Sequence, residues 1–170
     1  MQAIFTARAA ICSVALLVLG SCGEMEGGGS SFRDQYIVAR NALEEGHFAK
    51  ANRTYERLLP AAGPLSDRIG LEYAHSQLRS GDYAGAASRA RGIVASTTGA
   101  ARAAALAVEG TAEHEIGLEL LTAGKPSDAR AHLARAHSAL SEALANTAEV
   151  DPLGALAGRK SSIERQLGAL

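Results

Sequence analysis

The chain has 170 residues and a formal net charge of −1, with 17 Lys and Arg against 18 Asp and Glu. This length leaves room for one domain, and the balanced charge gives no argument for nucleic-acid binding. Aromatic residues make up 4% of the chain and Trp is absent, which disfavours a β-sandwich or barrel because strands favour aromatic and β-branched residues. Ala, the strongest helix former, is the commonest residue type, so the composition predicts an all-α protein.

Residues 1–21 have the organisation of a secretory signal peptide. Arg8 supplies a positive charge, and an uncharged apolar run follows over residues 9–19. A helix of that length spans about 16 Å, too short for the ~30 Å hydrocarbon core of a bilayer. The run is therefore predicted to be the apolar region of a signal peptide, with a buried helix of the domain as the alternative.

The apolar run ends in Leu19-Gly20-Ser21-Cys22, a branched apolar residue and two small residues before a cysteine. This tetrapeptide resembles the lipobox of bacterial lipoproteins. The resemblance implies cleavage before Cys22, lipid such as palmitate on that cysteine, and a membrane anchor in the bacterial cell envelope. Two or three acyl chains hold a protein stably at a membrane. Because Gly23 replaces the Asp that retains enterobacterial lipoproteins at the inner membrane, the resemblance also implies the outer membrane, facing the periplasm.

The remaining cysteine, Cys12, would leave with the signal peptide. Cys22 is then the one cysteine expected in the mature chain, so no thiol pair remains for a disulfide or a zinc site. Residues 22–31 begin with Cys22 and are rich in Gly and Ser, which predicts a flexible tether. Residues 32–170 are expected to form the folded helical-repeat domain.

From Ser31 onward, apolar residues recur with the period of an α-helix, and glycines divide them into hairpins. The pattern predicts helices over about 31–45, 48–59, 66–80, 83–94, 100–123, 126–150 and 153–167. Ser31 is expected to cap the first helix. In the longest helix the predicted inward stripe comprises Ala104, Val108, Ala112, Ile116 and Leu120, and Leu153 is expected on the apolar side of the last helix.

Three glycines between paired helices have matching surroundings. Gly46, Gly81 and Gly124 each follow a Leu by three residues and precede an Ala by five, at offsets of 35 and 43 residues. The pattern resembles the tetratricopeptide repeat, whose period is about 34 residues. This resemblance implies an array of about three helical hairpins with a C-terminal capping helix. The early Trp of that family is absent, and the third unit has Pro126 where the other two have an aromatic residue.

The chain is predicted not to be an enzyme and to hold no cofactor or metal. Its five histidines are scattered along the sequence. Glu113-His114-Glu115 resembles half of a zinc-protease motif, but Leu118 stands where the second His is needed. Paired acids such as Glu44-Glu45 fit a solvated helix end better than acid–base catalysis, which needs a shaped pocket.

In the repeat family that this chain resembles, the first helix of each hairpin lines a concave groove. Aligning the chain by its glycines places seven groove residues: Arg33, Tyr36, Arg40, Arg68, His75, Arg79 and His114. Arg and Tyr are enriched in interface hot spots, so the groove is predicted to bind an acidic or extended peptide. Ordinary solvated helix faces are the alternative interpretation.

The sequence thus predicts a membrane-anchored envelope lipoprotein that acts as a protein–protein interaction scaffold or adaptor. Its partner is expected to be another envelope protein, for example in the assembly of a pilus or secretion system. Contact with the membrane is expected through the lipid on Cys22, and no nucleic acid is expected. Two alternatives stay open: a self-associating structural or stress-linked envelope protein, and a periplasmic carrier of a small ligand.

Overall fold

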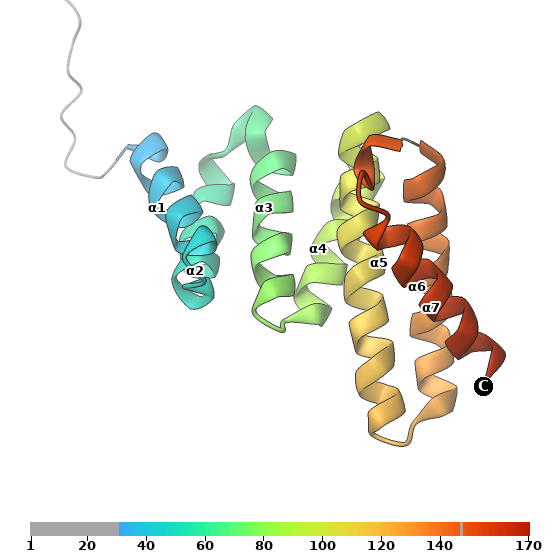
Figure 1. Cartoon of the computed structure of the whole chain (residues 1–170). Coiled ribbons are helices and arrows are strands. Elements are labelled where there is room, and N and C mark those ends of the chain that lie inside the picture. Colours follow the sequence, from blue (N-terminus) through green and yellow to red (C-terminus); the bar gives the residue numbers. More distant parts are fainter. Residues whose placement is uncertain (1–30, 147) are drawn as a thin grey trace, which may run out of the picture.

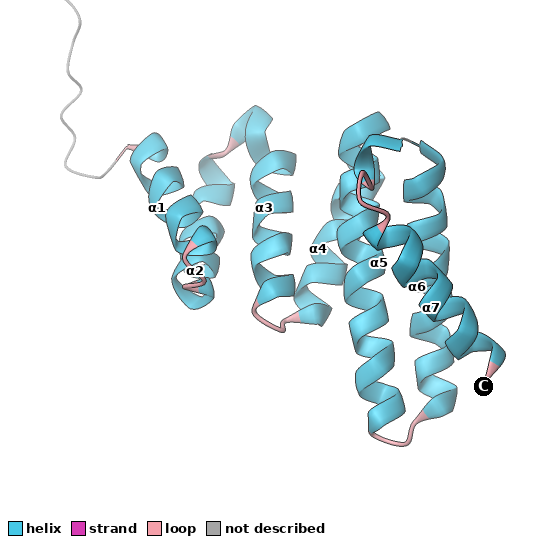
Figure 2. Cartoon of the chain, in the orientation of Figure 1, coloured by secondary structure: helices cyan, strands magenta, loops and turns pink. Residues whose placement is uncertain are grey.

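A computed structural model describes residues 31–146 and 148–170, and the regular structure of this part is entirely helical (Figure 2). Its α-helices are α1 (Phe32–Glu44), α2 (Phe48–Leu58), α3 (Ser66–Arg79), α4 (Tyr83–Ser96), α5 (Gly99–Thr122), α6 (Pro126–Asn146) and α7 (Ala155–Gly168). The prediction of an all-α protein is confirmed. The predicted signal peptide, the lipobox with Cys22 and the tether up to residue 30 lie outside the described residues.

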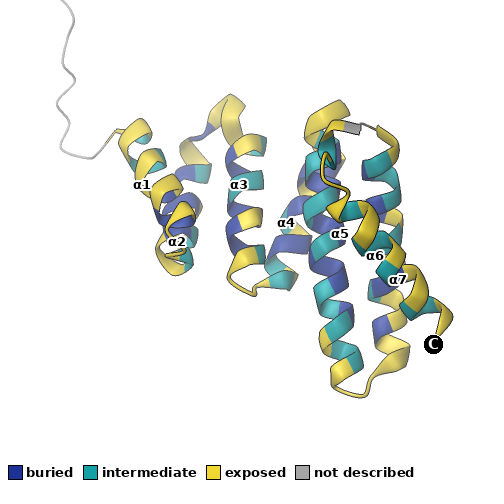
Figure 3. Ribbon diagram, in the orientation of Figure 1, coloured by how far each residue is buried: buried dark blue, intermediate teal, exposed yellow. Residues whose placement is uncertain are grey.

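The helices are arranged in a row in which each one packs against the next along the chain (Figure 1). The hairpin of α5 and α6 is the longest, and α7 lies across it at the C-terminal end. Because α5 also contacts α3 and α7, it is the central helix of the C-terminal half. Buried residues follow the faces between neighbouring helices, whereas the outer face of α1 is largely exposed (Figure 3). No helix among the described residues is both long and apolar enough to cross a bilayer.

The three hairpins share a glycine turn and a buried alanine. Gly46, Gly81 and Gly124 have φ values of +80°, +83° and +71°, in the left-handed region that disfavours residues with a Cβ. The alanines five positions later are fully buried: Ala51, Ala86 and Ala129. These turns end one helix and let the next approach closely, so the three hairpins share a left-handed glycine and a buried alanine at matching positions.

Two glycines bring α5 and α6 into close contact. A Cβ added to Gly110 would lie 2.7 Å from Leu140 Cγ, and one added to Gly117 would lie 2.8 Å from Leu133 Cδ2. Both leucines are 0% exposed. The leucines of α6 therefore occupy space that any larger residue on α5 would take.

The last helix begins at Ala155, after Gly154 with φ +73°. Asp151 caps it, since its carboxylate accepts hydrogen bonds from the backbone N–H groups of Leu156 and Ala157 at 3.0 and 2.9 Å. Those backbone bonds lower the pKa of Asp151. The placement of Leu153 on the apolar side of this helix is wrong, because Leu153 precedes the helix and is 92% exposed.

Candidate functional site

Three of the side chains predicted to line a groove, those of Tyr36, Arg40 and Arg68, meet at the carboxylate of Glu72. Tyr36 Oη donates a hydrogen bond to Glu72 Oε1 at 2.9 Å, and Arg40 Nη1 lies 3.3 Å from the same oxygen. Arg68, one turn before Glu72 on α3, has its Nε 3.6 Å from that oxygen. Since the Glu72 side chain is only 15% exposed, these donors compensate a largely buried negative charge.

Tyr55 on α2 also contacts Glu72. Its hydroxyl donates to Glu72 Oε2 at 3.0 Å, and the residue is 0% exposed. Burial, and then the negative charge of Glu72, raise the pKa of Tyr55 well above its ordinary value. The ring of Tyr55 also stacks on Tyr73 with centroids 6.2 Å apart. Glu72 thus joins α1, α2 and α3 and holds the side chains of Tyr36 and Arg40 in place.

The net positive charge of this surface is smaller than the number of its arginines, because some of them pair with glutamates. Arg40 pairs with Glu44 at 2.9 Å as well as with Glu72, and the hydrogen bond to Glu44 followed by the charge of Glu72 raises the pKa of Arg40. Arg33 has no acidic side chain within 4.0 Å in the described part of the chain. Positive charge is therefore available mainly at Arg33 and at Arg68, whose side chain is 70% exposed.

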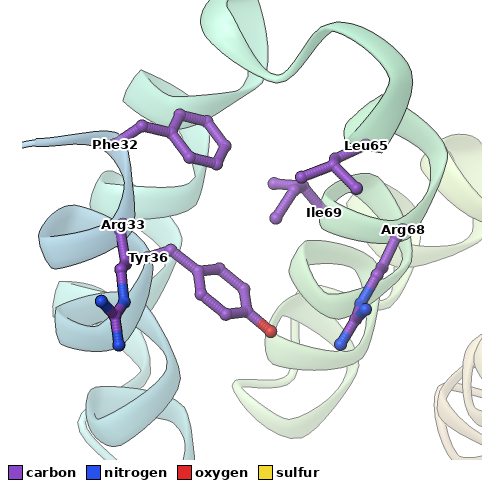
Figure 4. Close-up of a pocket in the computed structure, with 6 residues that line it drawn as sticks. All are labelled: Phe32, Arg33, Tyr36, Leu65, Arg68 and Ile69. Carbon is purple, nitrogen blue, oxygen red and sulfur yellow. The ribbon is translucent and has the colours of Figure 1, made fainter.

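These two arginines flank an apolar pocket of about 230 Å³ between the first turns of α1 and α3 (Figure 4). The rings of Phe32 and Tyr36 project from α1 toward Leu65 and Ile69 on the other side (Figure 4). Ile69 is 2% exposed and forms part of the pocket floor, while Leu65 is 47% exposed at its edge. An apolar side chain with an acidic neighbour would satisfy both parts of this surface. Leu65 and Ile69 were not among the predicted site residues: Leu65 lies in the turn before α3, and Ile69 carries no signal beyond helix periodicity.

His75 and Arg79 continue the same face of α3 toward its C-terminal end. Arg79 lies over the ring of Phe48 at 5.0 Å from its centroid, and its Nη1 donates to the carbonyl of Leu43 at 3.5 Å. Partial burial, and then the charges of Arg79 and Arg40, lower the pKa of His75. Both residues lie on the α3 surface as predicted, but neither lines the pocket.

The structure corrects the placement of His114 in an open groove. His114 is 5% exposed, because α7 covers it. Arg159 Nη1 lies 2.9 Å from His114 Nδ1, and His114 Nε2 lies 2.9 Å from Gln166 Oε1. An arginine can only donate, so Nδ1 accepts and the protonated Nε2 donates to Gln166. Burial lowers the pKa of His114, the bond to Gln166 opposes this, and the charge of Arg159 lowers the pKa further.

Comparison of the chain with protein-family models, with curated proteins and with solved structures finds no match. The properties of the surface itself must therefore indicate its role. Within residues 31–146 and 148–170, no three His, Cys, Asp or Glu side chains are grouped as metal ligands would be. The α1–α3 surface combines an apolar pocket lined by the ring of Tyr36 with exposed guanidinium groups. Features of this kind are typical of binding surfaces.

Proposed function

We propose that this chain is a lipid-anchored adaptor of the bacterial cell envelope that binds an extended segment of another envelope protein through α1 and α3. The observation that carries the proposal is the apolar pocket between Arg33 and Arg68. A pocket of this kind accepts one apolar anchor side chain, and arginine forks bind carboxylates on either side of it. A segment with an apolar residue flanked by acidic residues fits both features.

The position of this pocket agrees with an anchor at Cys22. Residues 23–31 separate that cysteine from the start of α1. Nine extended residues reach about 30 Å at 3.3–3.6 Å each, so a lipid on Cys22 would keep the pocket within that distance of a membrane surface. A partner that is itself membrane-bound, such as a component of a pilus or secretion system, would be met at high effective concentration.

The size of the α1–α3 pocket disfavours this pocket as the binding site of a small-ligand carrier. Pockets for such ligands usually enclose about 300–1,000 Å³ and bury most of the ligand, whereas this one measures about 230 Å³ and is open on one side.

Self-association has one supporting observation. Ile37 and Val38 are 42% and 41% exposed on α1, the helix that lies at the open end of the row (Figure 1).

Site-specific photo-crosslinking in cells that produce the full-length protein tests the proposal. A photoreactive amino acid at Leu65, which is 47% exposed, is expected to crosslink one heterologous envelope protein. Arg33→Glu combined with Arg68→Gln should reduce that crosslink at least tenfold. Arg53→Glu combined with Arg130→Gln is the matched control, because both of these arginines are exposed elsewhere on the surface.

The same photoreactive group at Lys125, in the exposed α5–α6 turn, should not capture that partner. Equal crosslinking in the Arg33/Arg68 variant and in its control would show that the pocket is not the binding surface. A crosslink from Leu65 to a second copy of this chain alone would instead support self-association.

A further inference from the structure

A second, open cavity lies among α4, α5 and α6 and shares no residue with the α1–α3 surface. Its volume is about 350 Å³, and its lining comprises Ala84, Ala87, Ser88, Arg91, Glu113, Ile116, His132 and Arg135. Small residues on α4 leave the space open, since Ala84 and Ser88 are exposed on that helix. The volume corresponds to roughly ten water molecules at about 30 Å³ each, which is room for a small polar group.

The floor of the cavity is the buried carboxylate of Glu113, whose side chain is 3% exposed. Arg91 Nη2 lies 2.6 Å from Glu113 Oε1, and Arg135 Nε lies 3.1 Å from Oε2. Arg91 Nε also donates to Glu109 Oε1 at 2.9 Å. The two glutamates therefore hold the two guanidinium groups in fixed orientations, one from α4 and one from α6.

His132 on α6 contacts both Glu113 and Arg135. Its Nδ1 lies 2.7 Å from Glu113 Oε2 and 2.9 Å from Arg135 Nη2. Nδ1 donates to the carboxylate when it carries a proton and accepts from the arginine when it does not.

The two guanidinium groups retain unused donors. An arginine has five N–H groups, and Arg91 uses two of them on Glu109 and Glu113. Arg135 uses one on Glu113 and directs a second at His132. Among the described residues, three N–H groups on each arginine have no protein acceptor and can donate to a ligand.

The arginine and glutamate side chains at this cavity differ in their exposure to solvent. The side chains of Arg91 and Arg135 are 52% and 46% exposed, whereas those of Glu109 and Glu113 are 11% and 3% exposed. Two arginines and two glutamates cancel in formal charge, but the acids lie beneath and the guanidinium groups lie at the opening. The accessible face of the cavity is therefore cationic.

We propose that this cavity binds an oxyanion, a carboxylate or phosphate group, between Arg91 and Arg135. Planar guanidinium groups match the oxygens of carboxylates and phosphates in bidentate geometry. The buried glutamates orient both arginines in advance, which lowers the entropic cost of binding. The oxyanion comes from a free phosphate compound or from an acidic side chain of a protein segment, and this site is independent of the adaptor surface on α1 and α3.

Ser88 offers a test that leaves the buried ion pairs intact. It is exposed, lines the cavity and lies one turn before Arg91 on α4. Ser88→Glu places a competing carboxylate at the opening, and Ser88→Lys adds a positive charge at the same position. Neither change removes a partner of Glu113, so both variants should keep the thermal unfolding midpoint of the unchanged protein.

Calorimetric titration of the full-length chain in detergent, at constant ionic strength set with sodium chloride, would use inorganic phosphate and N-acetyl-glutamate amide as probes. We expect saturable binding of at least one probe, about tenfold weaker in Ser88→Glu and several-fold tighter in Ser88→Lys. Tighter binding of phosphate identifies a free phosphate compound as the source, and tighter binding of the amide identifies an acidic side chain. Absence of saturable binding for both probes, or equal affinity in the two Ser88 variants, overturns the proposal.

Discussion

Glu72 accepts hydrogen bonds from the hydroxyls of Tyr36 and Tyr55, which belong to different helices. Alignment of the glycines places Tyr36 in the predicted groove, but it does not specify which residue of another helix Tyr36 meets. A carboxylate one turn after Arg68 resembles an ordinary surface ion pair within one helix. Its partners and its 15% exposure become evident only when α1, α2 and α3 are packed together.

His114 gives the molecule a pH dependence. Its pKa is lowered in the folded state, so the unfolded chain binds a proton first as the pH falls, and the folded state loses stability below the ordinary pKa of about 6.5. Urea unfolding should show a lower free energy of unfolding at pH 5.5 than at pH 7.5. Each histidine of this kind contributes at most about 1.4 kcal/mol per pH unit.

A variant separates this histidine from the other groups that titrate. His114→Gln keeps a polar side chain at the α5–α7 contact but cannot take up a proton. The decrease in stability between pH 7.5 and pH 5.5 should be smaller in the variant, and what remains should come partly from His75, whose pKa is also lowered. Identical pH dependence in the two proteins would contradict this account.

At the scale of single elements, the buried residues of α5 differ from the inward stripe that was predicted for this helix. Of the predicted inward stripe, Ala112 is buried, while Ala104, Val108, Ile116 and Leu120 are half-buried. The reason is that α5 contacts α3, α4, α6 and α7, so it is covered on several sides and small residues mark the closest contacts. An Ala-rich helix has little apolar contrast between its faces, and periodicity cannot then identify the contact face.

The close contact at Gly110 has a measurable consequence. In an open helical position, Gly→Ala stabilises by up to about 1 kcal/mol because alanine has the higher helix propensity. At Gly110 the added Cβ would lie 2.7 Å from Leu140 Cγ and 3.2 Å from the carbonyl oxygen of Ala136. Overpacking of this kind costs about 1–3 kcal/mol. Gly110→Ala should therefore lower the free energy of unfolding by about 1 kcal/mol in urea titrations.

Gly92→Ala and Gly158→Ala are the matched controls, because nothing lies within 4 Å of a Cβ added at either glycine. Both substitutions should raise the free energy of unfolding by a few tenths to about 1 kcal/mol. If Gly110→Ala also stabilised the protein, α6 would have to shift away from α5 more easily than the buried leucines allow.

For the whole molecule, the order of helices and turns follows from local signals, whereas the sites do not. Gly46, Gly81 and Gly124 each end a helix through their own backbone conformation, which does not depend on distant helices. A capping residue such as Ser31 acts within one turn, with its Oγ 3.2 Å from Asp34 N. The cavity around Glu113 instead combines α4, α5 and α6, with Arg91 and Arg135 44 positions apart. Pairings between distant helices depend on how those helices pack, which no local pattern records.

The proposed anchor at Cys22 concerns the molecule as a whole, because it would determine where the two proposed binding surfaces can act. If Cys22 is lipidated, Cys22→Ser removes the thiol that takes the acyl chain and should leave an uncleaved precursor without palmitate. The chain supplies its own control, since Cys12 lies within the predicted signal peptide and Cys12→Ser should be processed and labelled normally. Metabolic labelling with palmitate, together with the intact mass of the product, measures both steps. Normal labelling and cleavage of Cys22→Ser would contradict the anchor and would free the α1–α3 pocket from the distance limit of about 30 Å that a nine-residue tether imposes.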